Sequence, residues 1–177
     1  IETAELARSR GAKIYGEVLG FGLTNDADRM CAMDEAGTAG AKAIYQCLDR
    51  SKLMPTDIDY IHAHGTSTPL NDRRESQLIA QIFPNGVAVS STKGATGHTL
   101  GASGAVGIAF CLQAIATQTL PPCVGLKNPE FDIDLVRVPR QTDLNNLLCL
   151  SFGFGGQNAA MAIGKWHPKS SNTMEKI

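Results

Sequence analysis

A long uncharged stretch constrains this chain more than any other feature. From Gly94 to Leu126 the sequence contains no Asp, Glu, Lys or Arg. Five glycines occupy its first half: Gly94, Gly97, Gly101, Gly104 and Gly107. Glycines at this density, followed by Gln113 and Gln118, are typical of a helix packed against protein rather than of a membrane span. We therefore predict a close-packed, buried helix over 99–117, which ends before Pro121-Pro122 because proline cannot continue it.

Apolar runs alternate with helical patterns along the rest of the chain. Period and length predict five strands, at 13–23, 57–62, 87–90, 147–152 and 158–163, and two further helices, at 37–50 and 72–83. The last two strands flank Gly153-Phe154-Gly155-Gly156, which predicts a hairpin turn. This order predicts a layered α/β fold with a mixed sheet. The polar residues 165–177 predict a loose tail.

Composition excludes several function classes. The 177 residues are 43% hydrophobic, enough for one core in one domain. Sixteen basic against seventeen acidic residues give a formal charge of −1, which predicts no nucleic-acid or membrane partner. The five cysteines show no CxxC or metal-like spacing, and no secretory signal opens the chain. We expect a cytoplasmic protein without a metal.

Two histidines follow apolar runs and lie in turns rich in Gly and Thr. His64 belongs to the segment His62-Ala63-His64-Gly65-Thr66-Ser67-Thr68-Pro69, and His98 ends the segment Lys93-Gly94-Ala95-Thr96-Gly97-His98. A single histidine at a strand end is usually a structural residue. Together, two imidazoles beside glycines that let a ligand approach could donate hydrogen bonds to a developing oxyanion.

Two further signals accompany the histidines. Ser151-Phe152-Gly153-Phe154-Gly155-Gly156-Gln157-Asn158 follows an apolar strand, and its backbone N–H groups could face a ligand oxygen, although a tight hairpin is the simpler interpretation. Lys93 stands between a strand and the uncharged segment, where a solvated lysine is less expected.

The motifs HGTSTP, KGATGHTLGASGA and SFGFGGQNA, in this order and spacing, resemble the C-terminal half of a β-ketoacyl-acyl-carrier-protein synthase. The resemblance runs from about Gly11 to Gly164. It implies a thiolase-like αβαβα half with a mixed five-stranded sheet over residues 1–164, a homodimer or heterodimer, and decarboxylative Claisen condensation of malonyl-ACP with an acyl-enzyme thioester. The nucleophilic cysteine of this family lies in the N-terminal half, so we expect the isolated chain to be inactive in condensation.

The resemblance also implies roles for single residues. His64 and His98 match the two catalytic histidines, Lys93 the lysine between them, and Glu75 the acidic partner of that lysine. Phe154 matches the gating phenylalanine whose N–H joins the oxyanion hole. The positions matched to substrate binding are Thr66, Thr68, Cys31 and Gly155. No cofactor is implied, because phosphopantetheine arrives on the acyl carrier protein, which is the expected partner together with the N-terminal half.

The remaining cysteines and three other positions depart from the family's chemistry. Cys47, Cys111, Cys123 and Cys149 are most simply small core residues. Many relatives place the oxygen ligands of a structural monovalent cation where this chain has His62, Gly107 and Leu150. Because all three ligands are replaced together, we expect no ion there.

Two alternatives remain at this stage. His62-x-His64 resembles the HxH pair of a metal-dependent hydrolase, but 177 residues are too few for the barrel that usually carries that pair. A non-catalytic partner subunit of the chain-length-factor kind would keep the fold and lose the chemistry. The presence of both histidines, Lys93 and Glu75 argues against it.

Overall fold

Five strands form one mixed sheet in the order β1-β7-β6-β2-β3. The computed structural model describes residues 1–27 and 36–168. The strands are β1 (Glu17–Asn25), β2 (Tyr60–His62), β3 (Ala88–Ser90), β6 (Asn146–Gly153) and β7 (Gln157–Gly164). β1, β7 and β6 pair antiparallel, whereas β6, β2 and β3 pair parallel. The predicted mixed five-stranded sheet is confirmed, although β1 begins at Glu17 rather than at Lys13.

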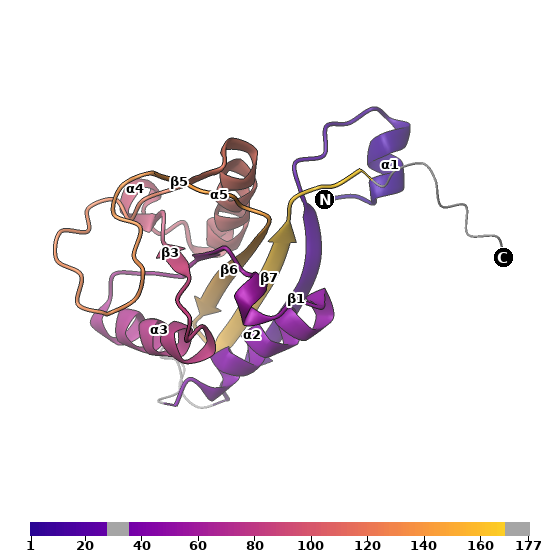
Figure 1. Cartoon of the computed structure of the whole chain (residues 1–177). Helices are drawn as coiled ribbons and strands as arrows, with labels where there is room; N and C mark the ends of the chain where they lie inside the picture. Colours follow the sequence, from indigo (N-terminus) through magenta and orange to yellow (C-terminus); the bar gives the residue numbers. More distant parts are fainter. Residues whose placement is uncertain (28–35, 169–177) are drawn as a thin grey trace.

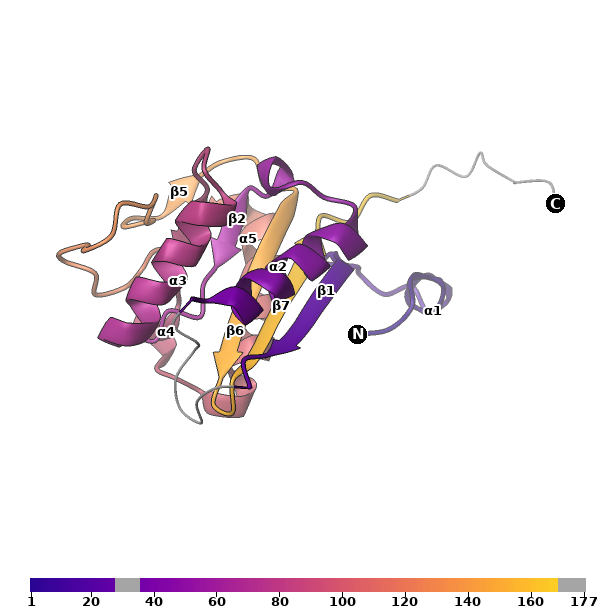
Figure 2. The ribbon, with the colours of Figure 1, turned by 90° about the horizontal axis from the view of Figure 1, so that it is seen from below.

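Helices cover both faces of this sheet. Figure 1 shows α2 (Thr38–Ser51) and α3 (Pro69–Ile82) on one face and α5 (Ser103–Thr117) on the other. Figure 2, seen from below, shows α2 lying across β1, β7 and β6 with α3 beside it. The smaller elements are α1 (Ala4–Ser9), η1 (Pro55–Asp57), α4 (Lys93–Thr96), η2 (Leu100–Ala102), β4 (Thr119–Leu120) and β5 (Arg140–Gln141). Sequence analysis missed α1, α4 and the β4–β5 pair because such short elements have no measurable period.

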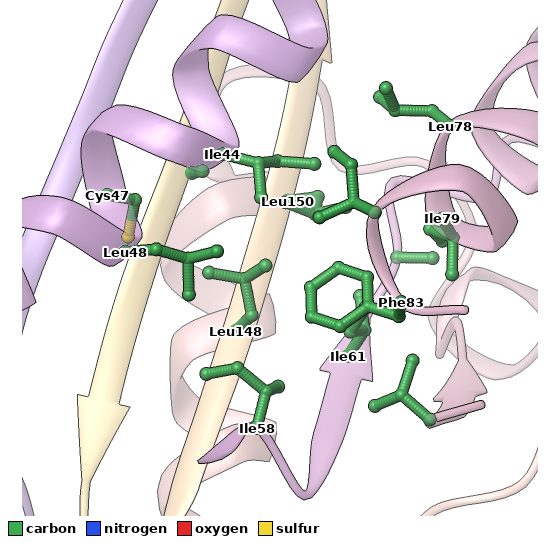
Figure 3. Close-up of a cluster of buried hydrophobic side chains, with 14 of the residues drawn as sticks. Ile44, Cys47, Leu48, Ile58, Ile61, Leu78, Ile79, Phe83, Leu148 and Leu150 are labelled. Carbon is green, nitrogen blue, oxygen red and sulfur yellow. The ribbon is translucent and has the colours of Figure 1, made fainter. Parts of the chain in front are cut away.

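The larger part of the core lies between the sheet and the α2–α3 layer. Figure 3 shows Ile44 and Leu48 of α2 against Leu148 and Leu150 of β6, with side chains of α3 beside them. The close approach of α2 depends on Gly22 of β1, where a Cβ atom would lie 1.8 Å from the Ala43 carbonyl oxygen. A side chain at this position would push the helix off the sheet.

The opposite layer is buried on one side only. The buried residues of α5 are Gly107, Cys111, Ala114 and Ile115, and these face the sheet. By length and composition alone, Leu100–Thr117 could cross a membrane. The expected close packing of this helix is therefore confirmed for its inner face but not for its outer face, which nothing in the described chain covers.

Strand β6 separates the two layers by the alternation of its side chains. Leu148 and Leu150 contribute to the cluster under α2 and α3, whereas Leu147 and Cys149 belong to the cluster under α5. This is the period of two that a pleated strand imposes. It also places the α5 layer on the same side of the sheet as the site described below.

Candidate active site

The three sequence motifs meet at one edge of the sheet. His64 follows the end of β2 by two residues, Lys93 follows the end of β3 by three, and Phe154 directly follows β6. These three strands are parallel neighbours, so their carboxyl ends lie side by side. Residues far apart in the sequence therefore converge at the position where open α/β sheets bind ligands.

A cavity of about 950 Å³ opens at this edge. Five predicted site residues line it: His64, Thr66, Thr68, His98 and Phe154. The Thr66 and Thr68 hydroxyls hydrogen-bond each other at 2.9 Å. Phe154 is 78% exposed.

The other predicted site residues lie elsewhere. Lys93, Glu75 and Gly155 do not line the cavity. The Gly155 carbonyl oxygen accepts a hydrogen bond from Asn25 Nδ2 at 2.8 Å, so this residue fixes the hairpin turn. Cys31 lies outside the described residues.

The two histidine rings lie next to each other in the cavity wall. Their centroids are 5.6 Å apart and the rings are nearly perpendicular. The backbone N–H of Leu100 donates to His98 Nδ1 at 3.0 Å, and the Ser103 hydroxyl lies 3.2 Å from the same atom. Because Nδ1 is an acceptor, the proton of a neutral His98 ring resides on Nε2.

His64 is buried and its ring is held neutral. It is 7% exposed and contacts the ring of Phe152 at a centroid distance of 5.9 Å. Burial, with smaller contributions from the neighbouring Lys93, His98 and His62 side chains, lowers the pKa of His64 to about 3. A neutral imidazole can donate one hydrogen bond without first losing a proton.

Glu75 holds the backbone on which His64 lies. Its Oε1 accepts from the His64 N–H at 2.7 Å, and its Oε2 accepts from the Gly65 N–H at 2.8 Å and from Asn71 Nδ2 at 3.1 Å. Burial raises the pKa of Glu75, while the three donors oppose that rise. Sequence analysis missed Asn71, whose signal is its position four residues before Glu75, on the same face of α3.

Lys93 binds the carbonyl side of the peptide unit between His64 and Gly65, whose N–H group binds Glu75. Its ammonium donates to the His64 carbonyl oxygen, and burial lowers the pKa of Lys93 while the nearby Glu75 raises it. Within the described chain the two side chains form no ion pair. Glu75 and Lys93 interact electrostatically, and both bind the main chain around His64.

The three positions that correspond to the cation ligands of relatives do not bring their side chains together in this structure. His62 and Gly107 are adjacent on the α5 side, whereas Leu150 faces the opposite layer. His62 Nε2 interacts with the Thr92 hydroxyl at 3.0 Å. Over the described residues, no three His, Cys, Asp or Glu side chains are grouped so that they could hold a metal. This arrangement gives no support to the hydrolase alternative.

Comparison with known proteins agrees with this geometry. Residues 15–127 match the family model for the β-ketoacyl synthase C-terminal domain. The chain is 43% identical over 172 residues to 3-oxoacyl-[acyl-carrier-protein] synthase 2 of Synechocystis, covering 94% of this chain and 41% of that protein. It is 41% identical over 170 residues to the mitochondrial 3-oxoacyl-[acyl-carrier-protein] synthase of Arabidopsis thaliana, covering 91% of this chain and 37% of that protein. The chain thus spans about two fifths of the length of the curated relatives it matches.

Solved structures show the same fold. A β-ketoacyl synthase from Burkholderia phymatum superposes with a TM-score of 0.88 at 34% identity, over 94% of this chain and 41% of that one. The ishigamide ketosynthase/chain length factor superposes with a TM-score of 0.89 at 32% identity, over 94% and 42% of the two chains. With the sheet, the motif positions and these matches in agreement, the chain belongs to the β-ketoacyl synthase family and represents its C-terminal domain.

Proposed function

We propose that this chain is the C-terminal catalytic half of a 3-oxoacyl-ACP synthase. In the proposed reaction, malonyl-ACP loses carbon dioxide and the resulting enolate attacks an acyl thioester carried by a cysteine of the N-terminal half. A new carbon–carbon bond forms, and the cysteine thiolate leaves. The covalent acyl-enzyme divides the reaction into transfer and condensation.

One observation carries the proposal: two imidazole hydrogen-bond donors from different loops line one cavity. Their rings are 5.6 Å apart, and the Leu100 N–H leaves Nε2 of His98 as the donor. Burial keeps His64 uncharged, so its ring does not compete for the carboxylate of malonate as a cation would. Decarboxylation places negative charge on the thioester oxygen, where fixed donors stabilise it most.

The remaining parts of the proposal concern substrate delivery and assembly. Thr66 and Thr68 would line the path of the phosphopantetheine arm, and the N–H of Phe154 would contribute to the oxyanion hole of the acyl-enzyme. No cofactor of its own is proposed. A polyketide acyl carrier protein bound to its ketosynthase appears among the similar structures, which supports an acyl carrier protein as partner. We also propose a cytoplasmic dimer. A ketosynthase in complex with its chain length factor is among the similar structures, which supports a paired assembly.

The experiment separates the two chemical steps in a complete synthase that contains this chain. His64→Ala and His98→Ala should each slow release of carbon dioxide from malonyl-ACP by about 10²–10³-fold, the usual loss for one oxyanion donor. Transfer of the acyl group to the enzyme should fall much less, since its nucleophile lies elsewhere. Lys93→Ala should also impair decarboxylation, because it frees the His64 carbonyl.

Lys127→Ala, at an exposed residue that does not line the cavity, serves as the control and should leave both steps unchanged. Equal loss of both steps in the three site variants would mean that these residues maintain the fold, and would exclude their role toward the enolate. A non-catalytic partner subunit would show no carbon dioxide release at all.

A further inference from the structure

A second group of reactive side chains lies behind the histidine pair. We call it the Cys149 cluster: His62 at the end of β2, Cys111 in α5 and Cys149 in β6. The three residues are 3%, 0% and 6% exposed. A Cβ atom on Gly107 would lie 2.8 Å from Cys149 Sγ and 3.0 Å from His62 Nδ1. The glycine therefore leaves room for the thiol and the imidazole to converge on one point under α5.

His62 has an unused polar atom at this point. Its Nε2 interacts with the Thr92 hydroxyl at 3.0 Å, whereas its Nδ1 is buried and has no hydrogen-bond partner in the described part of the chain. If Thr92 donates to Nε2, Nδ1 carries a proton that can bind a thiolate. If Nε2 donates to Thr92, Nδ1 can accept the proton of the thiol. Either tautomer favours the anionic form of a nearby sulfur.

Cys149 differs from the other cysteines in its environment. A hydrogen bond with Cys111 lowers the pKa of Cys149 most, His62 lowers it further, and burial opposes both effects. The same hydrogen bond raises the pKa of Cys111. Burial also raises the pKa of Cys47 and of the half-buried Cys123. Cys149 is a small core residue, as expected, but its surroundings differ from those of the other cysteines.

The cluster has access from outside. Cys149 is 6% exposed and lines the same cavity as His64 and His98, which gives a small molecule a route toward it. Cys111 and His62 do not line the cavity, so they would influence Cys149 from its buried side.

We propose that Cys149, paired with His62 and Cys111, is a covalent modification site for small uncharged soft electrophiles that enter the active-site cavity. This proposal stands apart from the condensation chemistry and does not require it. With iodoacetamide as the probe, the thiolate sulfur attacks the methylene carbon and a carbon–sulfur bond forms. The carbon–iodine bond breaks, and iodide leaves with the bonding electron pair. The attacking species is the thiolate, so the proton of any thiol form is lost to solvent before this step.

The test is a competition between cysteines of the folded protein at pH 6. Mass spectrometry of peptides after brief alkylation should show Cys149 reacting about tenfold faster than Cys123, although Cys123 is more exposed. At pH 6 a thiol of ordinary pKa is roughly 0.1–1% ionised, which outweighs the lower nucleophilicity of a low-pKa thiolate. Exposure alone predicts the opposite order, so faster alkylation of Cys123 would overturn the proposal.

Variants identify the source of the reactivity. His62→Asn and Cys111→Ala should each slow alkylation of Cys149 about tenfold or more at pH 6, because less of the sulfur is ionised. Met161→Leu, which changes the residue paired with Cys149 on β7 without changing any charge, should leave the rate within about twofold. Circular dichroism establishes that each variant is folded. An unchanged rate in both folded variants would contradict the role of the cluster, and Cys149→Ser identifies the modified peptide.

Discussion

The two histidines of the site are held in very different ways. The backbone of His64 is bound on both sides, by Glu75 at its N–H and by Lys93 at its carbonyl, and its ring is buried against Phe152. His98 is exposed and follows the short helix α4, and its ring is fixed by the Leu100 N–H and the Ser103 hydroxyl. One donor is fixed by the core, and the other by its own loop.

This contrast separates stability from reactivity. A substitution near His64 exposes buried polar groups or leaves them without hydrogen-bond partners, and this lowers the free energy of unfolding of the domain. A change near His98 removes contacts that water can replace. We therefore expect damage around His64 to reduce the free energy of unfolding, and damage around His98 to affect chemistry with little change in stability. Three predictions test this difference, beginning with the largest effect.

Glu75→Ala should lower the free energy of unfolding by about 3 kcal/mol, because it leaves the buried N–H of His64 and the half-buried N–H of Gly65 without an acceptor. Urea denaturation of the purified chain at pH 7 measures the loss. Glu130→Ala, at an exposed glutamate, is the matched control and should change the free energy by less than about 0.5 kcal/mol. Equal losses of unfolding free energy from the two substitutions would contradict the expected difference between the surroundings of His64 and those of His98.

Acid should destabilise the fold through His64. Its folded pKa of about 3 lies below the unfolded value of 6.5, so the unfolded chain binds the proton first as the pH falls. Stability from this residue is complete at neutral pH, and about 2 kcal/mol should be lost between pH 7 and pH 5. Glu75, whose pKa is raised, contributes with the opposite sign.

The comparison with His64→Asn isolates this contribution. Glu75 is present in both proteins, so the difference between their pH dependences belongs to the histidine. The asparagine variant should lose about 2 kcal/mol less between pH 7 and pH 5 than the original chain. Parallel curves would show that the His64 ring titrates in the folded protein as it does in the unfolded chain.

Ser103→Ala should have the smallest effect. It removes one of the two contacts to His98 Nδ1, at an exposed ring whose other contact to Leu100 remains. We expect a change below about 0.5 kcal/mol in the free energy of unfolding. In a complete synthase, release of carbon dioxide should fall less than about threefold, corresponding to about 0.6 kcal/mol. A loss as large as that of His98→Ala would show that the hydroxyl, rather than the backbone, orients the ring.

Much of the site could be predicted because it follows strand ends. His64, Lys93 and Phe154 were recognised from their positions just after apolar runs, and the parallel strands bring them together at one edge. The start of α3 was predicted three residues late, although Pro69 at the first helical position is a recognised signal.

Other features could not be predicted because they depend on individual atoms. The resemblance pairs Glu75 with Lys93 as residues, but it does not show that the buried carboxylate binds the nearest backbone N–H groups. The environment of Cys149 was missed for a different reason. β6 is buried on both faces, so its continuous apolar run does not reveal which layer each side chain enters.

The alternation along β6 has a consequence for how this domain can change. Leu148 and Leu150 pack under α2 and α3, whereas Cys149 and Ser151 line the cavity. Positions that line the cavity and positions that fill the main core thus alternate along residues 148–151 of one strand. A library that varies only positions 149 and 151 would change the cavity wall while the core under α2 and α3 stays intact. A single-residue deletion in this strand would exchange the two sets and disrupt the cavity wall and the core at once.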